Sequence, residues 1–191
     1  MKNTNEVTIG TQVWMAENLN VSTFRNGDPI PEAKTDKEWE KAGEEGKPAW
    51  CYYNNDPANG DKYGKLYNGY AVNDPRGLAP EGLHMPSGDE WTILTDYLGG
   101  KQIAGTKMKT KTDWKQDGNG TNSSRFSGLP GANRIGDGRF DGVGAYGCWW
   151  SAMEDTVSTS TWYRSLFYAN GNLSSARPIM TTGLSVRCLR D

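Results

Sequence analysis

The sequence predicts an α+β fold with two helices, several short antiparallel strands and long loops. Two capping boxes, Thr35 with Glu38 and Ser87 with Glu90, stand just before amphipathic runs and mark the starts of two helices. Short runs rich in β-branched and aromatic residues lie towards both ends of the chain, as expected for antiparallel strands. The 24 glycines indicate many turns between these elements.

The first half of the chain contains one predicted helix and three strand-like runs. Residues 7–15 alternate around Gly10, which predicts a strand or a tight hairpin. The first capping box predicts a helix over residues 35–43, ended by Gly43. Two further runs predict strands, at 49–53 and 65–72, and the polar residues 54–61 between them predict a loop.

The second half begins with the clearest helix and ends in short strands. Helical spacing of Trp91, Leu94 and Leu98 predicts a helix over residues 87–98, and Gly99-Gly100 ends it. About fifty residues rich in Gly, Asn and Ser follow and predict long loops. The final section predicts strands at 147–152, 161–168, 176–179 and 184–189. Because no repeat, linker or break in composition divides residues 1–191, we expect a single domain.

Composition and charge exclude several classes of protein. The chain has 21 basic and 23 acidic residues and no basic stripe, so we expect no nucleic-acid partner. No stretch approaches the roughly 20 apolar residues of a membrane span, so we expect no membrane insertion. The first residues have no apolar core of a signal peptide. Export by another route, packaging in a particle and a trimmed N-terminus all remain open.

Short motifs in a fixed order resemble one known family. They run from Gly10 to Leu19 (GTQVWMAENL), Gly82 to Trp91 (GLHMPSGDEW), Phe126 to Gly131 (FSGLPG), Trp149 to Ser151 and Gly183 to Cys188 (GLSVRC). Together they cover nearly the whole chain and resemble the Fibrobacter succinogenes major paralogous domain. That family is related to the sulfatase-modifying-factor group, and both resemble the C-type lectin fold.

The resemblance implies a compact C-type-lectin-like domain. Such a domain has two helices, a twisted antiparallel sheet, long loops and terminal strands that pair. We therefore expect the strand around Val7–Val13 to pair with the last strand, Leu184–Leu189.

A further resemblance is to the variable proteins of diversity-generating retroelements. Those proteins carry C-type-lectin-like domains in which randomised adenines scatter Asn codons into Ser, Thr, Ala and other residues. The stretch after Trp149-Trp150 holds many residues reachable in that way, which implies a variable ligand-binding region over about residues 148–182. The protein sequence alone does not distinguish this from an ordinary Ser- and Thr-rich loop.

Within this region, small polar residues alternate with larger framework residues. Since successive side chains of a strand point to opposite faces, variable and framework positions can interleave. We expect Trp150, Trp162, Leu166, Val186 and Cys188 in the core, and larger anchors such as Ile179 among the contacts. The candidate ligand-binding residues are Cys148, Met153, Asp155, Ser158, Ser160, Tyr163, Ser165, Phe167, Ala169, Asn170, Asn172, Ser174, Ala176, Pro178, Met180 and Thr181.

No catalytic pattern emerges from the sequence. The one histidine, His84, precedes a helix start, where relatives usually carry Arg, and is expected to be structural. Formylglycine-generating relatives need a copper-binding cysteine pair, and Cys51, Cys148 and Cys188 form no recognisable pair. We expect free thiols, although one disulfide bridge is left open by the count.

No cofactor is assigned from the sequence. The sugar-binding strings of calcium-dependent lectins, Glu-Pro-Asn, Gln-Pro-Asp and Trp-Asn-Asp, are missing. The run Asp117 to Asn122 begins like an EF-hand loop but lacks Gly at the sixth position and Glu at the twelfth. Asp137 and Asp141 flank another Gly-rich turn. Solvated turns explain both segments, so a structural calcium is unsupported.

The leading expectation is a non-enzymatic module that presents the region 148–182 to a protein or glycan ligand. A bacterial or phage protein at a cell or particle surface, outside the cell, is the favoured setting. The alternatives are an enzyme of the sulfatase-modifying type and a purely structural or adhesive surface domain. The oligomeric state and the identity of the ligand stay open.

Overall fold

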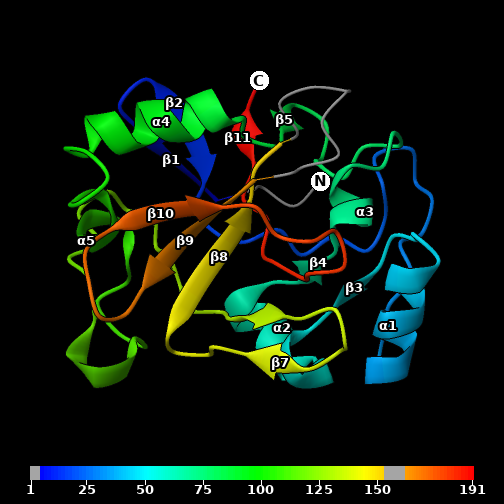
Figure 1. The fold of residues 1–191 in the computed structure, drawn as a ribbon. Helices are drawn as coiled ribbons and strands as arrows, with labels where there is room; N and C mark the ends of the chain where they lie inside the picture. Colours follow the sequence, from blue (N-terminus) through cyan, green and yellow to red (C-terminus); the bar gives the residue numbers. More distant parts are fainter. Residues whose placement is uncertain (1–4, 153–161) are drawn as a thin grey trace.

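The computed structural model of the chain describes residues 5–152 and 162–191, and it mixes helices with small antiparallel sheets (Figure 1). The α-helices are α1 (Asp36–Glu44), α2 (Ala58–Tyr63), α3 (Gly69–Val72), α4 (Gly88–Tyr97) and α5 (Ala104–Met108), with 3-10 helices η1 (Tyr53–Asn55) and η2 (Lys115–Asp117). The strands are β1 (Glu6–Ile9), β2 (Gln12–Met15), β3 (Trp50–Cys51), β4 (Leu66–Tyr67), β5 (Leu83–His84), β6 (Asn133–Arg134), β7 (Phe140–Asp141), β8 (Tyr146–Trp150), β9 (Tyr163–Phe167), β10 (Leu173–Ala176) and β11 (Leu189–Arg190).

A four-stranded sheet joins the two ends of the chain, in the order β1-β2-β11-β5. Gly10, with φ 63°, makes the tight turn that lets β1 and β2 form a hairpin. In β11, Leu189 pairs with Trp14 on one side and with His84 on the other. The expected pairing between the terminal strands is therefore confirmed, but it uses the second arm of the N-terminal hairpin and a much shorter C-terminal strand.

The two predicted helices are confirmed as α1 and α4. In α1, the Thr35 hydroxyl accepts a hydrogen bond from the Glu38 N–H, while the Glu38 carboxylate accepts one from the Thr35 N–H. Ser87 and Glu90 form the same reciprocal cap on α4. Each cap satisfies backbone donors that the first helical turn leaves without partners, so both helices start where the local sequence specifies.

A three-stranded sheet, in the order β10-β9-β8, forms the centre of the C-terminal half. Its register places Trp150 opposite Tyr163 and Leu166 opposite Leu173. The third strand begins at Leu173, earlier than the expected 176–179, because this register buries Leu173 beside Leu166. Of the expected strand 184–189, only Leu189 lies in a regular strand, β11, while Gly183 to Ser185 make isolated bridges.

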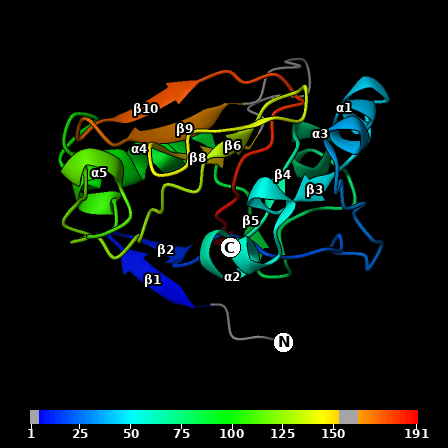
Figure 2. The ribbon, with the colours of Figure 1, turned by 90° about the horizontal axis from the view of Figure 1, so that it is seen from below.

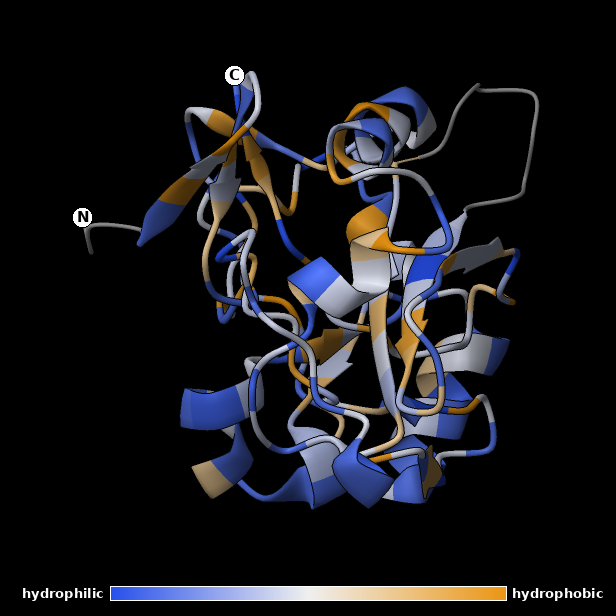
Figure 3. Ribbon diagram, turned by 90° about the vertical axis from the view of Figure 1, so that its left-hand side faces the viewer, coloured by the Kyte–Doolittle hydropathy of each residue, from blue (hydrophilic) through white to orange (hydrophobic). Residues whose placement is uncertain are grey.

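Alternate residues of the three-stranded sheet enter two different hydrophobic clusters. Trp149 and Leu166 belong to a cluster with Trp14, Trp91 and Phe126, whose rings lie 4.8 to 6.0 Å apart. Trp150, the next residue, belongs to a second cluster with Tyr67 and Val186. In Figure 3 apolar positions lie mainly on central segments and hydrophilic ones mainly on peripheral helices and loops. The sheet is therefore covered on both faces along β8.

Several short elements differ from the expectations. The predicted loop 54–61 contains part of η1 and of α2, and the second half of the expected strand 65–72 is the helix α3, capped by the Asn68 side chain. The long predicted loops after α4 contain α5, η2, β6 and β7. Within the described residues no helix has the length and apolar character that a membrane span requires.

Candidate functional site

The hairpin formed by β9 and β10 carries most of the described candidate residues. We call these the hairpin face: Tyr163, Ser165, Phe167, Ala169, Asn170, Asn172, Ser174 and Ala176. Ala169, Asn170, Asn172, Ser174 and Ala176 are exposed, while Tyr163, Ser165 and Phe167 are half-buried. All eight come from one short hairpin, so the structure brings them together.

Burial on this side of the sheet decreases from β8 to the edge strand β10. In the register, Cys148 of β8 lies opposite Ser165 of β9, which lies opposite Ser174 of β10. Cys148 is buried with 4 % exposure, Ser165 is half-buried and Ser174 is exposed. Cys148 was expected among the ligand contacts, but its side chain packs in the core, in the hydrophobic cluster that contains Tyr67 and Trp150. We therefore leave it out of the hairpin face.

Strand alternation separates framework from surface, as the sequence predicts. Leu166 and Leu173 are buried, whereas Phe167 and Ser174, the next residues in the chain, face the other side of the sheet. Trp150, Val186 and Cys188 are buried as expected. Trp162 was also expected in the core, but it precedes β9 and is only half-buried. The Arg177 guanidinium lies 4.6 Å from the centre of its ring.

A buried lysine holds the turn of the hairpin. Lys109 is 3 % exposed, and its ammonium donates to the carbonyl oxygens of Gly118 (2.6 Å) and Asn170 (3.0 Å). Weaker contacts join it to the carbonyls of Phe167 and Tyr168 at 3.3 and 3.4 Å. Burial lowers the pKa of Lys109. The turn that displays Ala169, Asn170 and Asn172 is thus fixed from inside the molecule.

Pro178, Met180 and Thr181 follow the hairpin and are not part of its strands. They belong to the connection after β10 that runs towards α1 and α3 (Figure 1). The Gly69 N–H donates to the Met180 carbonyl at 2.8 Å, and the Trp39 indole donates to the Thr181 carbonyl at 3.0 Å. All three are half-buried. Met180 and Thr181 therefore connect the C-terminal segment to the N-terminal half. The remaining candidates, Met153, Asp155, Ser158 and Ser160, lie outside the described residues.

Sequence reasoning missed an aromatic neighbour of the hairpin face. Tyr146 of β8 is 37 % exposed and stacks on Phe167, with ring centres 4.8 Å apart and planes 25° from parallel. Tyr168 packs edge-on against Phe167 at 4.5 Å. Tyr146 lies outside the region 148–182, and only the register between β8 and β9 places it beside Phe167. This aromatic group offers rigid contact area next to the small polar residues.

The groups considered for catalysis have structural partners. The ring nitrogens of His84 contact Asp191 at 2.8 Å and Glu90 at 2.9 Å. Glu90, the partner of His84, also accepts from the Ser87 N–H in the cap of α4. The three cysteines are free and buried, and burial raises the pKa of Cys51 to about 11 and of Cys148 and Cys188 to about 12. A thiol in such a setting is a poor nucleophile or metal ligand.

The loop that begins like an EF-hand uses its oxygens internally. The Asn119 side-chain oxygen accepts from the Trp114 N–H at 3.1 Å, and the Asn122 side-chain oxygen accepts from the Ser127 N–H at 2.9 Å. The carbonyl of Gly118 already accepts from Lys109. Across the described ranges, no three His, Cys, Asp or Glu side chains are grouped so that they could hold a metal ion.

A family model, described as the Fibrobacter succinogenes major domain, matches residues 7–190. The match spans every strand and helix described above except the first residue of β1. No curated protein and no solved structure matches the chain.

Proposed function

Because the chain belongs to the Fibrobacter succinogenes major domain family and carries an exposed hairpin over a buried core, we propose that it is a non-enzymatic binding module. The hairpin face would contact a macromolecular ligand, either a protein or a glycan. The observation that carries this proposal is that buried side chains along β9 and β10 lie beside more exposed ones. Leu166 and Leu173 hold the hairpin, while small side chains beside them are exposed and hold nothing in the core.

The chemistry of the hairpin face suits adaptable binding. Ser, Asn and Ala side chains offer small polar or neutral contacts, and the neighbouring rings of Phe167 and Tyr146 offer an anchor of low conformational entropy. The internal contacts of Lys109 fix the turn without using its side chains. Substitution on this face would therefore alter recognition without changing the scaffold.

The finer fold assignment that we propose is a C-type-lectin-like domain. Pairing of β2 with β11, two capped helices and long loops support it. We also propose diversification of the region by a retroelement and a place at a cell or particle surface. A second copy of the 3′ coding region that differs only at adenines, beside a reverse transcriptase gene, would support diversification. A coding region without such a copy would contradict it.

The test pairs a binding assay with a stability measurement. Replacing Ala169, Ser174 and Ala176 together with Tyr should change stability by no more than about 0.5 kcal/mol per site, as for ordinary surface changes. The same variant should lose about tenfold or more in affinity for ligands that the parent selects from a displayed protein library or a glycan array. A matched control replaces the exposed residues Lys37, Glu40 and Lys111 with Tyr and should retain binding.

Trp149→Ala supplies the core reference. Trp149 is fully buried, so its loss should cost roughly 3–5 kcal/mol. Trp162 does not serve for this comparison, since it is half-buried. Equal binding by the parent and the hairpin variant, or unfolding of the hairpin variant, would contradict the proposal.

A further inference from the structure

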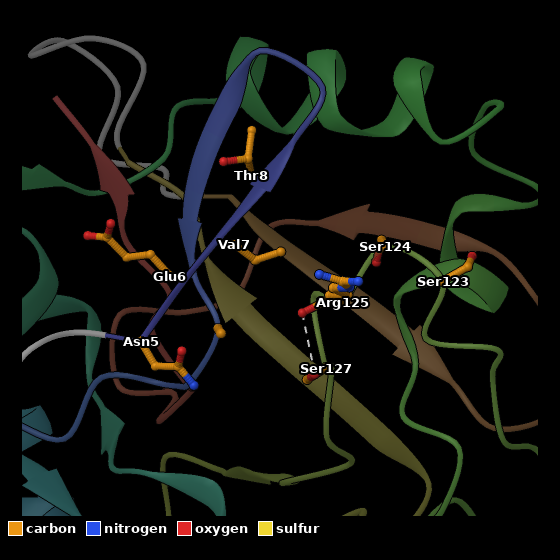
Figure 4. A pocket seen from close by; sticks show the side chains of 9 residues that line it. Asn5, Glu6, Val7, Thr8, Ser123, Ser124, Arg125 and Ser127 are labelled. Atoms are coloured by element: carbon orange, nitrogen blue, oxygen red, sulfur yellow. Dashed lines mark hydrogen bonds between the residues drawn. The ribbon is translucent and has the colours of Figure 1, made fainter.

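A polar groove of about 740 Å³ lies between β1 and the segment that precedes β6. One wall consists of Asn5 to Thr8, and the other includes Ser123, Arg125 and Ser127 (Figure 4). Figure 2 shows β1 and β2 on the opposite side of the molecule from β9 and β10. The groove is therefore separate from the hairpin face, and its role is independent of the function proposed above.

The β1 wall is the edge of a sheet. The Asn5 carbonyl accepts a hydrogen bond from the Ala16 N–H at 2.8 Å, so the backbone groups of Asn5 and Val7 point towards β2. In an antiparallel pair the intervening residues point the other way, which directs the N–H and C=O of Thr8 away from β2. No described strand pairs with β1 on that side. An edge of this kind can accept a further strand.

The opposite wall is a rigid loop with an unusual backbone. Asn122, Arg125 and Ser127 have φ values of 49°, 60° and 54°, in the left-handed region that favours glycine. The Ser127 N–H donates to the Asn122 side-chain oxygen at 2.9 Å, and the Asn122 side-chain nitrogen donates to the Ser127 hydroxyl at 3.0 Å. Phe126 is fully buried between Arg125 and Ser127. The loop is therefore preorganised by contacts that do not involve the Arg125 side chain.

Arg125 has no structural role that explains its identity. Glycine would adopt its backbone conformation with less strain. Its guanidinium is exposed and makes no hydrogen bond, ion pair or ring contact within the part of the chain that the structure describes. In Figure 4 the Val7 side chain points towards this guanidinium from the β1 wall. A side chain that adds strain and gains no internal partner is suited to an external anion.

We propose that this groove binds an extended peptide segment that carries an acidic side chain. The segment would pair with the free backbone groups of Thr8 and extend the four-stranded sheet by one strand. Its carboxylate would accept a charge-assisted, bidentate hydrogen bond from Arg125. The edge of β1 favours a peptide over a glycan, because only a peptide backbone repeats donors and acceptors at the spacing of a strand.

The probe is a set of blocked hexapeptides of Thr and Val with one Asp placed at each position in turn. We expect the best register to bind the full chain, and the Thr8 amide to become protected from hydrogen exchange. Changing the Asp of that peptide to Asn, or Arg125 to Gly, should weaken binding by about tenfold or more. Arg125→Lys should retain part of the affinity, since it keeps the charge without the fork.

The Arg125→Gly variant should also melt at a higher temperature than the parent, because it relieves the left-handed strain. Gln116→Gly is the matched control: Gln116 is exposed with φ 50° and lies outside the groove, so its replacement should raise the melting temperature and leave peptide binding unchanged. If Arg125→Gly does not fold, Arg125→Gln removes the charge and should show the same loss of binding.

Four results would overturn the proposal. The first is that no peptide of the set shows saturable binding, and the second is that the parent and the charge-free Arg125 variants bind equally well. The third is that N-methylation of alternate peptide bonds leaves binding unchanged. The fourth is that a galacturonate oligosaccharide binds when no peptide does. Loss of peptide binding here would leave the hairpin face untouched, so failure of either proposal can be recognised separately.

Discussion

Buried cations are the main feature of this protein at the scale of single residues. Lys65, Lys109, Arg134 and Arg187 are each at most 5 % exposed, and each lies within 6 Å of an aromatic ring centre. Among them, only Arg134 has an ion pair within the described residues, with Asp36 at 3.1 Å. Burial lowers the pKa of Arg187 to about 9. For Lys65, Lys109 and Arg187, ring faces and carbonyl or amide oxygens therefore compensate the charge in place of carboxylates.

His84 gives a pH-dependent contact at the same scale. Partial burial lowers the pKa of His84, but its hydrogen bonds to Glu90 and Asp191 outweigh this and leave the pKa raised above 6.5. A group whose pKa is raised in the folded protein stabilises it fully at pH values below the pKa of the unfolded chain. This stabilisation is lost as the pH rises through the pKa of the folded protein. We therefore expect His84→Gln to destabilise the protein more in mild acid than in mild base.

The measurement is urea unfolding of the parent and His84→Gln at about pH 5.5 and about pH 8.5. The difference in free energy of unfolding between the two proteins should shrink at the higher pH. Comparing the two proteins at each pH cancels the titration of groups that both share. A difference that grows with pH would show that His84 is neutral in the folded protein and would contradict the assignment.

At the scale of elements, the contacts of Lys109 determine the order of the β9–β10 turn. Lys109→Met keeps the length of the side chain but leaves the carbonyls of Gly118 and Asn170 without their charged donor. We expect a loss of about 2–3 kcal/mol, as for a hydrogen-bonded charged group. The amides of residues 168–172 should exchange faster, since the turn loses its internal support.

Hydrogen exchange followed by mass spectrometry checks this prediction. Lys111→Met is the control, because Lys111 is exposed and should leave both stability and exchange unchanged. Lys109→Arg should lie between the parent and Lys109→Met, since it keeps the charge with a different shape. Unchanged exchange in the turn of Lys109→Met would show that the hairpin is held by its strands alone.

The helices show which elements local sequence can specify. α1 and α4 begin at reciprocal side-chain caps, and both were predicted from three-residue spacings. α2 and α5 have no side-chain cap, and α3, although Asn68 caps it, is only four residues long and stands in a run that also suits a strand. Their helical form depends on packing against the rest of the molecule, so the sequence pattern alone predicted a loop or a strand in their place.

At the scale of the whole molecule, β11 couples the two ends of the chain. Leu189 is 4 % exposed and lies between Trp14 and His84 in the middle of the four-stranded sheet. We expect Leu189→Ala to cost about 2–5 kcal/mol. Because β11 joins the N-terminal hairpin to β5, the loss should lower the stability of the entire fold and not only loosen its end.

Fluorescence and circular dichroism during urea unfolding test this coupling. Both signals should shift together to a lower midpoint in Leu189→Ala, as in a single cooperative transition. Arg190→Ala is the matched control on the same strand, since it removes only an exposed ion pair with Glu6 and should cost at most about 1 kcal/mol. Separate transitions for the two signals would show that the sheet unfolds apart from the rest.

The sequence by itself determined the features that depend on neighbours a few residues apart. These are the two capped helices, the N-terminal turn at Gly10 and the alternation that separates Leu166 from Phe167. Only the tertiary structure decided which alternating positions are exposed. It buried Cys148 in a hydrophobic cluster, left Trp162 half-buried and placed Tyr146 beside the hairpin face.

The physical reason is the range over which each interaction acts along the chain. A cap or a turn is satisfied by atoms within one helical turn or one hairpin, so its residues appear together in the sequence. Burial of a charge or a strand edge requires partners that folding brings from far away. The Arg187 guanidinium bonds to the Asn18 side chain across 169 positions, and the groove pairs β1 with a loop more than a hundred residues later. Such partners become visible only when the register and packing of the whole chain are known.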